Sequence, residues 1–274
     1  MDRLVNFFVL GPLMVTIDSS PVPIPAGRQR ALLAALLLKA NEVVPVDELI
    51  DRLWDDDLPH RPRGALHTCL TRVRQALDGQ GAGVSELIQT SAAGYMIELS
   101  ADHLDLLRFR NLAASARSAA ERGDLQQESA TLAQALSLWR GPVLTDVRSA
   151  AIHRDLVPKL TEEWLHVLER WHMVSFALGR HPELVGELRF LVRKYPFHER
   201  FWHLLVLALY RCGRQVEALQ AYGEVSGYLR EELGVDPGEE LRRLHLAILR
   251  GDPRLMTADL GCVSTSPSVA SAAR

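Results

Sequence analysis

One stretch of the sequence, "RPRGALHTCLTRVRQALD" from Arg61 to Asp78, predicts a helix with two unlike faces. At 3.6 residues per turn its apolar residues gather on one side, as in a helix that rests on a core; they are Leu66, Cys69, Leu70, Val73 and Leu77. The other side is basic and rich in hydroxyl groups; it carries His67, Thr68, Thr71, Arg72 and Arg74, with Arg61 and Arg63 before it. No acidic residue precedes Asp78 in this stretch, so the second face suits an anionic partner.

The segments before this helix predict a small sheet and two further helices. Residues 7–25 contain short β-rich pieces separated by Gly and Pro, which is typical of antiparallel strands. Residues 28–40 and 46–54 have helical periodicity, and Pro45 suits the first turn of the second of these helices.

The segment after the helix predicts a hairpin. Residues 87–90 and 95–99 have strand character and flank a short turn in which Gly94 can take a positive φ. Sheet, three helices and hairpin is the order of a winged helix-turn-helix, whose third helix enters the DNA major groove while the hairpin, or wing, reaches the backbone or minor groove. Taken alone, the basic face could be the solvated side of an ordinary amphipathic helix, and the order of the elements disfavours that alternative.

From residue 102 onward the sequence predicts only helices. "GRHPEL" at Gly179 and "GRQVEA" at Gly213 lie 34 residues apart, and Phe176 and Tyr210 keep the same offset. Thirty-four residues is the length of a tetratricopeptide repeat, and "RGDLQQESATLAQAL" is a weaker echo of the same pattern. An irregular helical bundle is the alternative.

We therefore predict a mainly α protein of two domains. Residues 1–100 form a winged helix-turn-helix domain with a small antiparallel sheet, three helices and a wing. Residues 101–253 form an all-α, tetratricopeptide-like domain. Residues 254–274 are small, polar and unpatterned, which predicts a disordered tail or a linker.

Charge and cysteine content limit which partners the protein can bind and which cellular compartment it suits. The formal charge of −3 excludes a general polycation, so nucleic acid must be bound by a local basic patch. Three widely spaced cysteines argue against a disulfide framework and for a reducing compartment. A basic leader with a cleavage site and an 18-residue apolar span are both missing, so we expect a cytoplasmic protein without membrane contact.

The sequence predicts no enzyme, cofactor or metal site. It contains neither a phosphate-binding "GxxxxGK[ST]" motif nor "HExxH", and no combination of nucleophile, base and orienting group stands out. The acidic run at residues 55–57 lacks the glycine turn and the spaced Glu of a calcium loop, and we interpret it as a solvated loop.

Several longer stretches resemble the Streptomyces antibiotic regulatory protein family. "FFVLGPLMV", "RQRALLAALLLKANEVVPVDELIDRLW", "ALHTCLTRVRQAL" and "AAGYMIEL" are similar to its OmpR-type DNA-binding domain. "LWRGPVL", "LYRCGRQVEALQAYGEV" and "LREELGVDPGEELRRLHLAILRGDP" are similar to its bacterial transcriptional activation domain. In particular, the sequence resembles the N-terminal part of the large AfsR-type members, whose further ATPase and repeat regions are missing from it.

This resemblance implies a transcriptional activator, with site residues in named roles. It implies binding to direct repeats in promoters of antibiotic genes and contact with RNA polymerase, including its sigma factor. Thr68, Thr71 and Arg72 take base-facing positions. Arg74 takes the role of a phosphate clamp, and His67 can take it as well. Tyr95 follows Gly94 in the wing, where "SAAGYMI" departs from the prolines or arginine often found in the family, so we expect a weak grip there.

Two expectations about assembly complete the prediction. Residues 1–100 contain 9 Lys and Arg against 12 Asp and Glu, so one copy should bind DNA weakly and we expect a side-by-side dimer on direct repeats. The same residues hold a complete winged-helix plan, so recognition should not need the helical half as a reader. A protein-protein adaptor, whose winged helix binds protein instead of DNA, is the alternative function.

Overall fold

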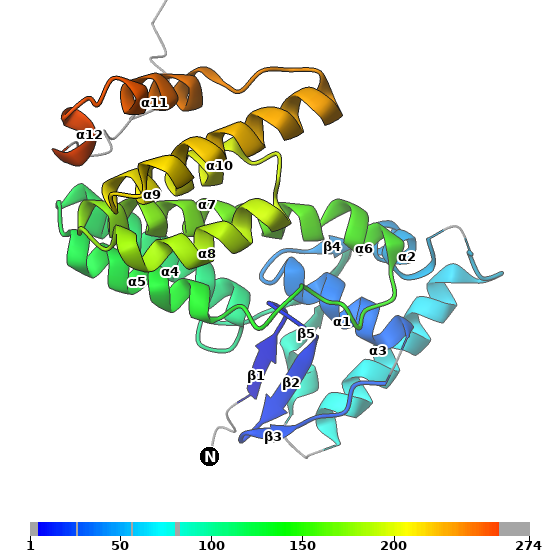
Figure 1. Cartoon of the computed structure of the whole chain (residues 1–274). Helices are drawn as coiled ribbons and strands as arrows, with labels where there is room; N and C mark the ends of the chain where they lie inside the picture. The colour runs from blue at the N-terminus through cyan, green and yellow to red at the C-terminus, as the bar shows by residue number, and fades with distance from the viewer. Residues whose placement is uncertain (1–4, 26, 56, 80–82, 258–274) are drawn as a thin grey trace, which may run out of the picture. The chain divides into compact units, whose positions relative to one another are not determined.

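The computed structural model describes residues 5–25, 27–55, 57–79 and 83–257. The chain divides into two compact units, residues 1–168 and 169–274. Figure 1 shows the small sheets in the first unit and only helices in the second. The sequence-based prediction of a mainly α fold, with a winged helix followed by helices, is confirmed.

The first unit begins with a three-stranded antiparallel meander. Strands β1 (Val5–Phe8), β2 (Met14–Ile17) and β3 (Ser20–Pro21) pair in chain order. Side chains of β1 and β2 alternate between buried and half-buried, so one face of the sheet covers the core.

Three helices follow. In α1 (Arg28–Leu38) every residue from 31 to 38 is buried, so this helix forms the centre of the core. Helices α2 (Val46–Trp54) and α3 (Pro62–Asp78) each pack on α1 and on one another through one apolar face. A single turn of 3₁₀-helix (Val84–Leu87) then leads to the wing.

The wing belongs to a second three-stranded sheet. Strands β5 (Ile88–Thr90) and β6 (Gly94–Ile97) form the hairpin, and the short strand β4 (Val44–Pro45) pairs with the other edge of β6. The sequence did not predict β4, and the placement of Pro45 in a helix was wrong. Pro45 lies in this strand and directly precedes the first turn of α2.

The first unit continues beyond the winged helix into α4 (Asp105–Glu121), α5 (Leu125–Ser137), α6 (Ala150–Asp155) and the start of α7 (Val157–Ala177). The Asp105 carboxylate is almost fully buried and accepts hydrogen bonds from the amides of Val9 and Leu10, at 2.8–3.0 Å. Burial raises the pKa of this carboxyl, and the two amides and Arg140 oppose the rise.

A second carboxylate ties the same parts of the first unit together. Asp146 accepts a hydrogen bond from the Leu13 amide at 2.9 Å and forms an ion pair with Arg30 of α1. Because the first compact unit runs on to residue 168, the domain boundary at residue 100 stays a prediction.

The second unit contains the rest of α7, then α8 (His181–Lys194), α9 (Glu199–Arg211) and α10 (Gln215–Tyr228). A π-helical turn (Leu229–Leu233), α11 (Glu239–Leu249) and the short α12 (Arg254–Thr257) complete it. Helix α12 lies at the start of the segment predicted to be a tail; residues 258–274 lie outside the described residues. No helix in the described part of the chain is long and apolar enough to cross a membrane.

The predicted repeat appears as a repeated helix-turn-helix corner. Gly179 and Gly213 both have φ 74°, and their amides bond to the carbonyls of Phe176 and Tyr210 at 3.0 and 2.9 Å. Gly123, between α4 and α5, has φ 73° and makes the same bond to Ala120 at 2.9 Å. Glycine suits all three corners because a positive φ closes a helix without a Cβ clash. The weak echo at residue 123 is therefore a third copy of the corner.

Candidate nucleic-acid interface

Helix α3 is held by its apolar face. Leu66, Leu70, Val73 and Leu77 are at most 1% exposed, and the helix packs against α1 and α2. Each such side chain contributes about 1.5–3 kcal/mol when buried. Pro62 begins the helix, where its missing N–H costs nothing. The opposite face of α3 is thereby presented to solvent in a fixed orientation.

The exposed face carries most of the α3 residues that the sequence predicts to bind DNA. Arg61, His67, Thr68, Thr71 and Arg72 are all exposed. The hydroxyls of Thr68 and Thr71 donate to carbonyls one turn earlier, both at 3.0 Å, which leaves their oxygen lone pairs and methyl groups available. Within the part of the chain that the structure describes, neither the Arg61 nor the Arg72 guanidinium has a hydrogen-bond or ion-pair partner.

Arg63 lies on the same helix in a different setting. Its guanidinium is 3.6 Å from the carboxylate of Asp47 on α2, and both side chains are about four-fifths exposed. An ion pair so exposed contributes about 0–1 kcal/mol. A stronger anion can therefore replace Asp47 as its partner at little cost.

Arg74 connects α3 to the wing. Its Nη2 donates to the Ile88 carbonyl at 2.7 Å and to the Thr90 hydroxyl at 3.2 Å, both on β5. A guanidinium has five N–H donors, and the contacts found among the described residues use those of Nη2. Arg74 thus has a bracing role that the sequence did not reveal, and it keeps donors for a phosphate.

The wing turn is exposed at Ser91, Ala92 and Ala93. Tyr95 is half-buried and pairs with Thr90 on one side and Val44 on the other. The wing thus presents small residues and backbone at its tip, and no described residue of the turn carries a positive charge.

The reason predicted for Gly94 was wrong. Gly94 does not adopt a positive φ; it is buried where β6 passes β4, and a Cβ there would lie 2.0 Å from the Val44 carbonyl oxygen. Glycine is required because the two backbones approach closely. Gly94 therefore shapes the wing from inside.

Two further residues beside α3 were missed. An open hollow of about 600 Å³ is lined by Arg28 at the start of α1, Trp54 at the end of α2, and Thr68, Cys69 and Arg72 of α3. The Arg28 guanidinium lies 5.3 Å from the centre of the Trp54 ring and 3.3 Å from Asp57. Arg28 stands alone in the sequence before an apolar run, so only the fold reveals that it adjoins Arg72.

The hollow has the polar groups of an anion site. Trp54 is 4% exposed, and its indole Nε1–H is buried without an acceptor among the described residues. Burial raises the pKa of the Cys69 thiol, and the charges of Arg28 and Arg72 oppose that rise. The two guanidinium groups that line the hollow, those of Arg28 and Arg72, can together hold a phosphate oxygen.

Comparison with known proteins identifies both halves of the chain. Residues 25–97 match the family model of "Transcriptional regulatory protein, C terminal", and residues 104–249 match that of "Bacterial transcriptional activator domain". The regulatory protein DnrI of Streptomyces peucetius is 35% identical over 250 residues, which cover 89% of this chain and 92% of DnrI. The chain belongs to the Streptomyces antibiotic regulatory protein family of transcriptional activators.

Two other members of the family are longer. AfsR of Streptomyces coelicolor is 38% identical over 95% of this chain but only 26% of its own length. EmbR of Mycobacterium tuberculosis is 35% identical over 92% of the chain, which spans 65% of EmbR. A solved structure of that EmbR, in complex with a low-affinity phosphopeptide, superposes with a TM-score of 0.86 at 34% identity and covers 93% of this chain and 69% of EmbR.

The family assignment fits the position of the candidate interface. All residues of the α3 face, the wing and the hollow fall within the matched segment 25–97. The relatives are named as regulatory proteins, not as enzymes. Among its described residues, no group of His, Cys, Asp and Glu is arranged to hold a metal ion.

Proposed function

We propose that this activator binds duplex promoter DNA through α3, with Thr68, Thr71 and Arg72 facing base edges in the major groove. The observation that carries the proposal is the exposed face of α3, on which the guanidinium groups of Arg61 and Arg72 have no partner among the described residues. Arginine binds guanine bidentately, and threonine offers a hydroxyl and a methyl group to phosphate or thymine.

The surrounding residues bind the DNA backbone. Phosphates beside the groove that α3 enters accept hydrogen bonds from Arg61, Arg63, His67 and Arg74. The hollow of Arg28 and Trp54 receives a further phosphate. Such contacts set the register of the protein on DNA, while base contacts set the sequence. The wing, with backbone at its tip and Tyr95 beside Gly94, adds a weak contact.

The test is DNA binding at several salt concentrations. Genomic fragments captured by the full chain supply a binding sequence, and mobility shifts then measure its affinity. We expect log K to fall steeply with log salt, and the Arg61→Ala, Arg72→Ala double variant to lose the preference for that sequence. Arg117→Ala, Arg122→Ala is the control, because both are exposed arginines outside the candidate interface.

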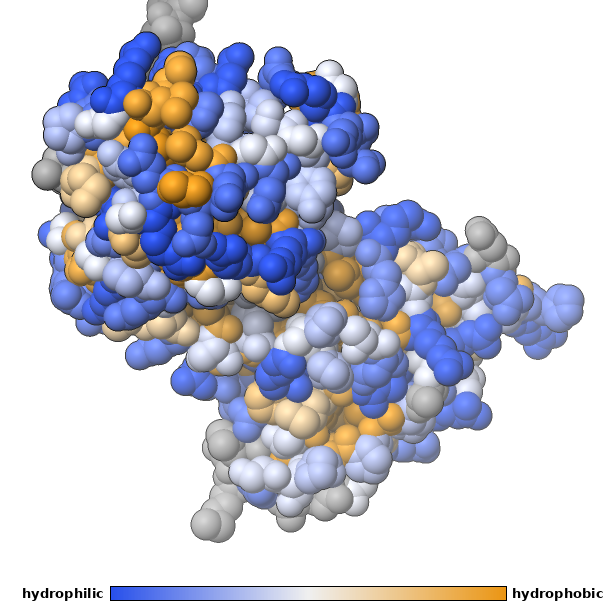
Figure 2. Space-filling view, in the orientation of Figure 1, coloured by the Kyte–Doolittle hydropathy of each residue, from blue (hydrophilic) through white to orange (hydrophobic). Residues whose placement is uncertain are grey.

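A flat salt dependence would favour the adaptor function. EmbR was solved with a bound phosphopeptide, and exposed apolar surface supports a protein partner here as well. Leu246 and Leu249 of α11 are about half exposed, and Figure 2 shows apolar side chains gathered over this helix. Such patches mark protein-binding surfaces.

In an activator, this surface serves transcription. The helical domain contacts RNA polymerase, including its sigma factor, and braces two copies side by side on direct repeats about one helical turn apart. Inserting half a turn between repeats should abolish cooperative binding. Transcription by purified RNA polymerase should be stimulated by the whole chain. A Leu246→Glu, Leu249→Glu variant that still occupies the promoter should not stimulate it. Undiminished stimulation would place the polymerase contact elsewhere.

A further inference from the structure

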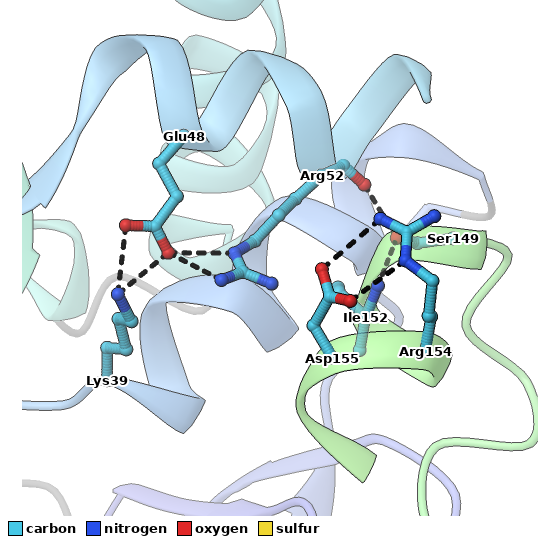
Figure 3. Close-up of polar contacts among 7 residues, drawn as sticks. All are labelled: Lys39, Glu48, Arg52, Ser149, Ile152, Arg154 and Asp155. Carbon is cyan, nitrogen blue, oxygen red and sulfur yellow. Dashed lines mark hydrogen bonds and ion pairs between the residues drawn. The ribbon is translucent and has the colours of Figure 1, made fainter. Parts of the chain in front are cut away.

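Helices α2 and α6, far apart in the sequence, are joined end to side by hydrogen bonds (Figure 3). The Ser149 hydroxyl, at the start of α6, donates to the Arg52 carbonyl of α2 at 2.6 Å. The same oxygen accepts from the Ile152 amide at 3.1 Å and so caps α6.

Asp55 completes this joint from the other side. Its carboxylate accepts from the amides of Ala150 and Ala151 at 3.1 and 2.8 Å. The first amides of a helix have no partner within the helix. Here Asp55, a residue of the winged helix, satisfies two of them and Ser149 satisfies the next. The first turn of α6 is therefore built on the end of α2.

The backbone of Asp55 adopts a conformation that α6 can hold in place. Its φ is 45° and its ψ −119°, which is rare for any residue other than glycine. Asp55 lies directly after α2, at the point where the chain turns toward α3. Backbone torsions at this residue determine the direction in which the chain leaves α2.

The rest of α2 is fixed against α1. Glu48 accepts from Lys39 at 2.7 Å and from Arg52 at 2.6 Å. Burial raises the pKa of Glu48, but these hydrogen bonds outweigh burial and leave it below its ordinary value. Because α2 itself is held against α1, a change in the backbone torsions of Asp55 moves the segment that leads to α3.

We infer that Asp55 is a positioning residue through which the helical domain fixes the approach of α3 to DNA. By accepting the α6 amides, Asp55 keeps its unusual torsions, and these set the path of the chain into the recognition helix. Asp55 itself touches no base. This inference rests on the proposed function. It adds that sequence recognition depends on Asp55, the residue that accepts the first amides of α6.

The test compares variants of the full chain on the captured promoter sequence and on unrelated DNA. Asp55→Gly tolerates the positive φ but removes both acceptors, so specific affinity should fall about tenfold while binding to unrelated DNA does not weaken. Asp55→Asn keeps one acceptor and tolerates a positive φ, so it should restore most of that loss. Asp51→Ala removes the same charge from an exposed side chain of α2, away from the hollow and the joint, and should cause no loss.

Two more measurements separate this role from a general loss of structure. The variants should melt within a few degrees of the wild-type chain, and hydrogen exchange should quicken at Ala150 and Ala151 in Asp55→Gly. Ser149→Ala should weaken specific binding in the same way, and the double variant should lose less than the product of the two single losses.

The outcomes distinguish the two proposals. Undiminished sequence preference in a folded Asp55→Gly variant, or an equal fall on both DNAs, would overturn the positioning role. A wild-type chain without salt-dependent DNA binding would overturn the proposed function itself.

Discussion

The exposed face of α3 and the joint between α2 and α6 use similar residues in opposite ways. At the joint, Asp55 and Ser149 bond to atoms more than ninety residues away, and their capacity for hydrogen bonds is used inside the fold. On α3, Thr68 and Thr71 bond only within their own helix, and Arg72 has no partner in the described part of the chain. Polar groups that are satisfied internally hold the fold, whereas groups left with spare donors are available for recognition.

The largest effect should come from cutting the chain after residue 100. The cut removes Asp105 and Asp146, the acceptors for the amides of Val9, Leu10 and Leu13. The cut also removes the buried side chains of Leu104, Leu106 and Phe109, each worth about 1.5–3 kcal/mol, so the loss should approach the whole stability of a domain, about 5–15 kcal/mol. Urea unfolding of residues 1–100 and 1–168 checks this: only the longer form should unfold cooperatively.

This prediction opposes the expectation from sequence that residues 1–100 suffice for recognition. Cooperative unfolding and intact sequence preference in the short form would show that the polar contacts to the helical segment are dispensable. A third form, residues 1–253, should bind DNA as the full chain does.

Gly94→Ala should have the next largest effect. Its Cβ would lie 2.0 Å from the Val44 oxygen, so β4 and β6 must separate, at a cost of about 3 kcal/mol. Thermal unfolding measures the loss. Gly64→Ala is the control, because Gly64 is exposed in α3 with no close neighbour and alanine there should stabilise by about 0.5–1 kcal/mol. Equal melting temperatures for the two variants would contradict the close-approach explanation.

Gly94 and Arg74 also show what the sequence could and could not predict. Periodicity is local, so it predicted the strands of the first sheet and of the wing hairpin, the helices and the two faces of α3. The partners of a side chain are set by distant segments, so the bond from Arg74 to β5, the strand β4 and the approach of Arg28 to Arg72 could not be read from spacing. Of the candidate interface, the α3 face was predictable and the hollow beside it was not.

Arg72→Ala should affect binding and not folding. Arg72 is exposed and makes no internal hydrogen bond among the described residues, so the free energy of unfolding should change by no more than about 0.5 kcal/mol. Specific binding should weaken by about 1–3 kcal/mol, with relaxed preference at one base pair. Affinities for a set of single-base variants of the promoter check this, and an unchanged preference would remove Arg72 from the readers.

Arg74→Ala should have a modest effect on both DNA binding and stability. Losing the bonds to Ile88 and Thr90 should cost about 1 kcal/mol of stability. The slope of log K against log salt should become shallower by about one, equally for all DNA sequences. Arg74→Lys keeps the charge and should restore the salt dependence more fully than the stability. A variant altered in only one of the two assays would assign Arg74 to that role alone.

The contacts of Asp105 and Asp146 also bear on how the protein is made. They join residues 96 and 133 positions apart, so the segment between β1 and β2 cannot complete its hydrogen bonds until that much more chain has been synthesised. Closing such long loops is slow compared with forming a helical hairpin, whose contacts are local. On the ribosome, the DNA-reading domain therefore matures only after the first helices of the activation domain have left the exit tunnel.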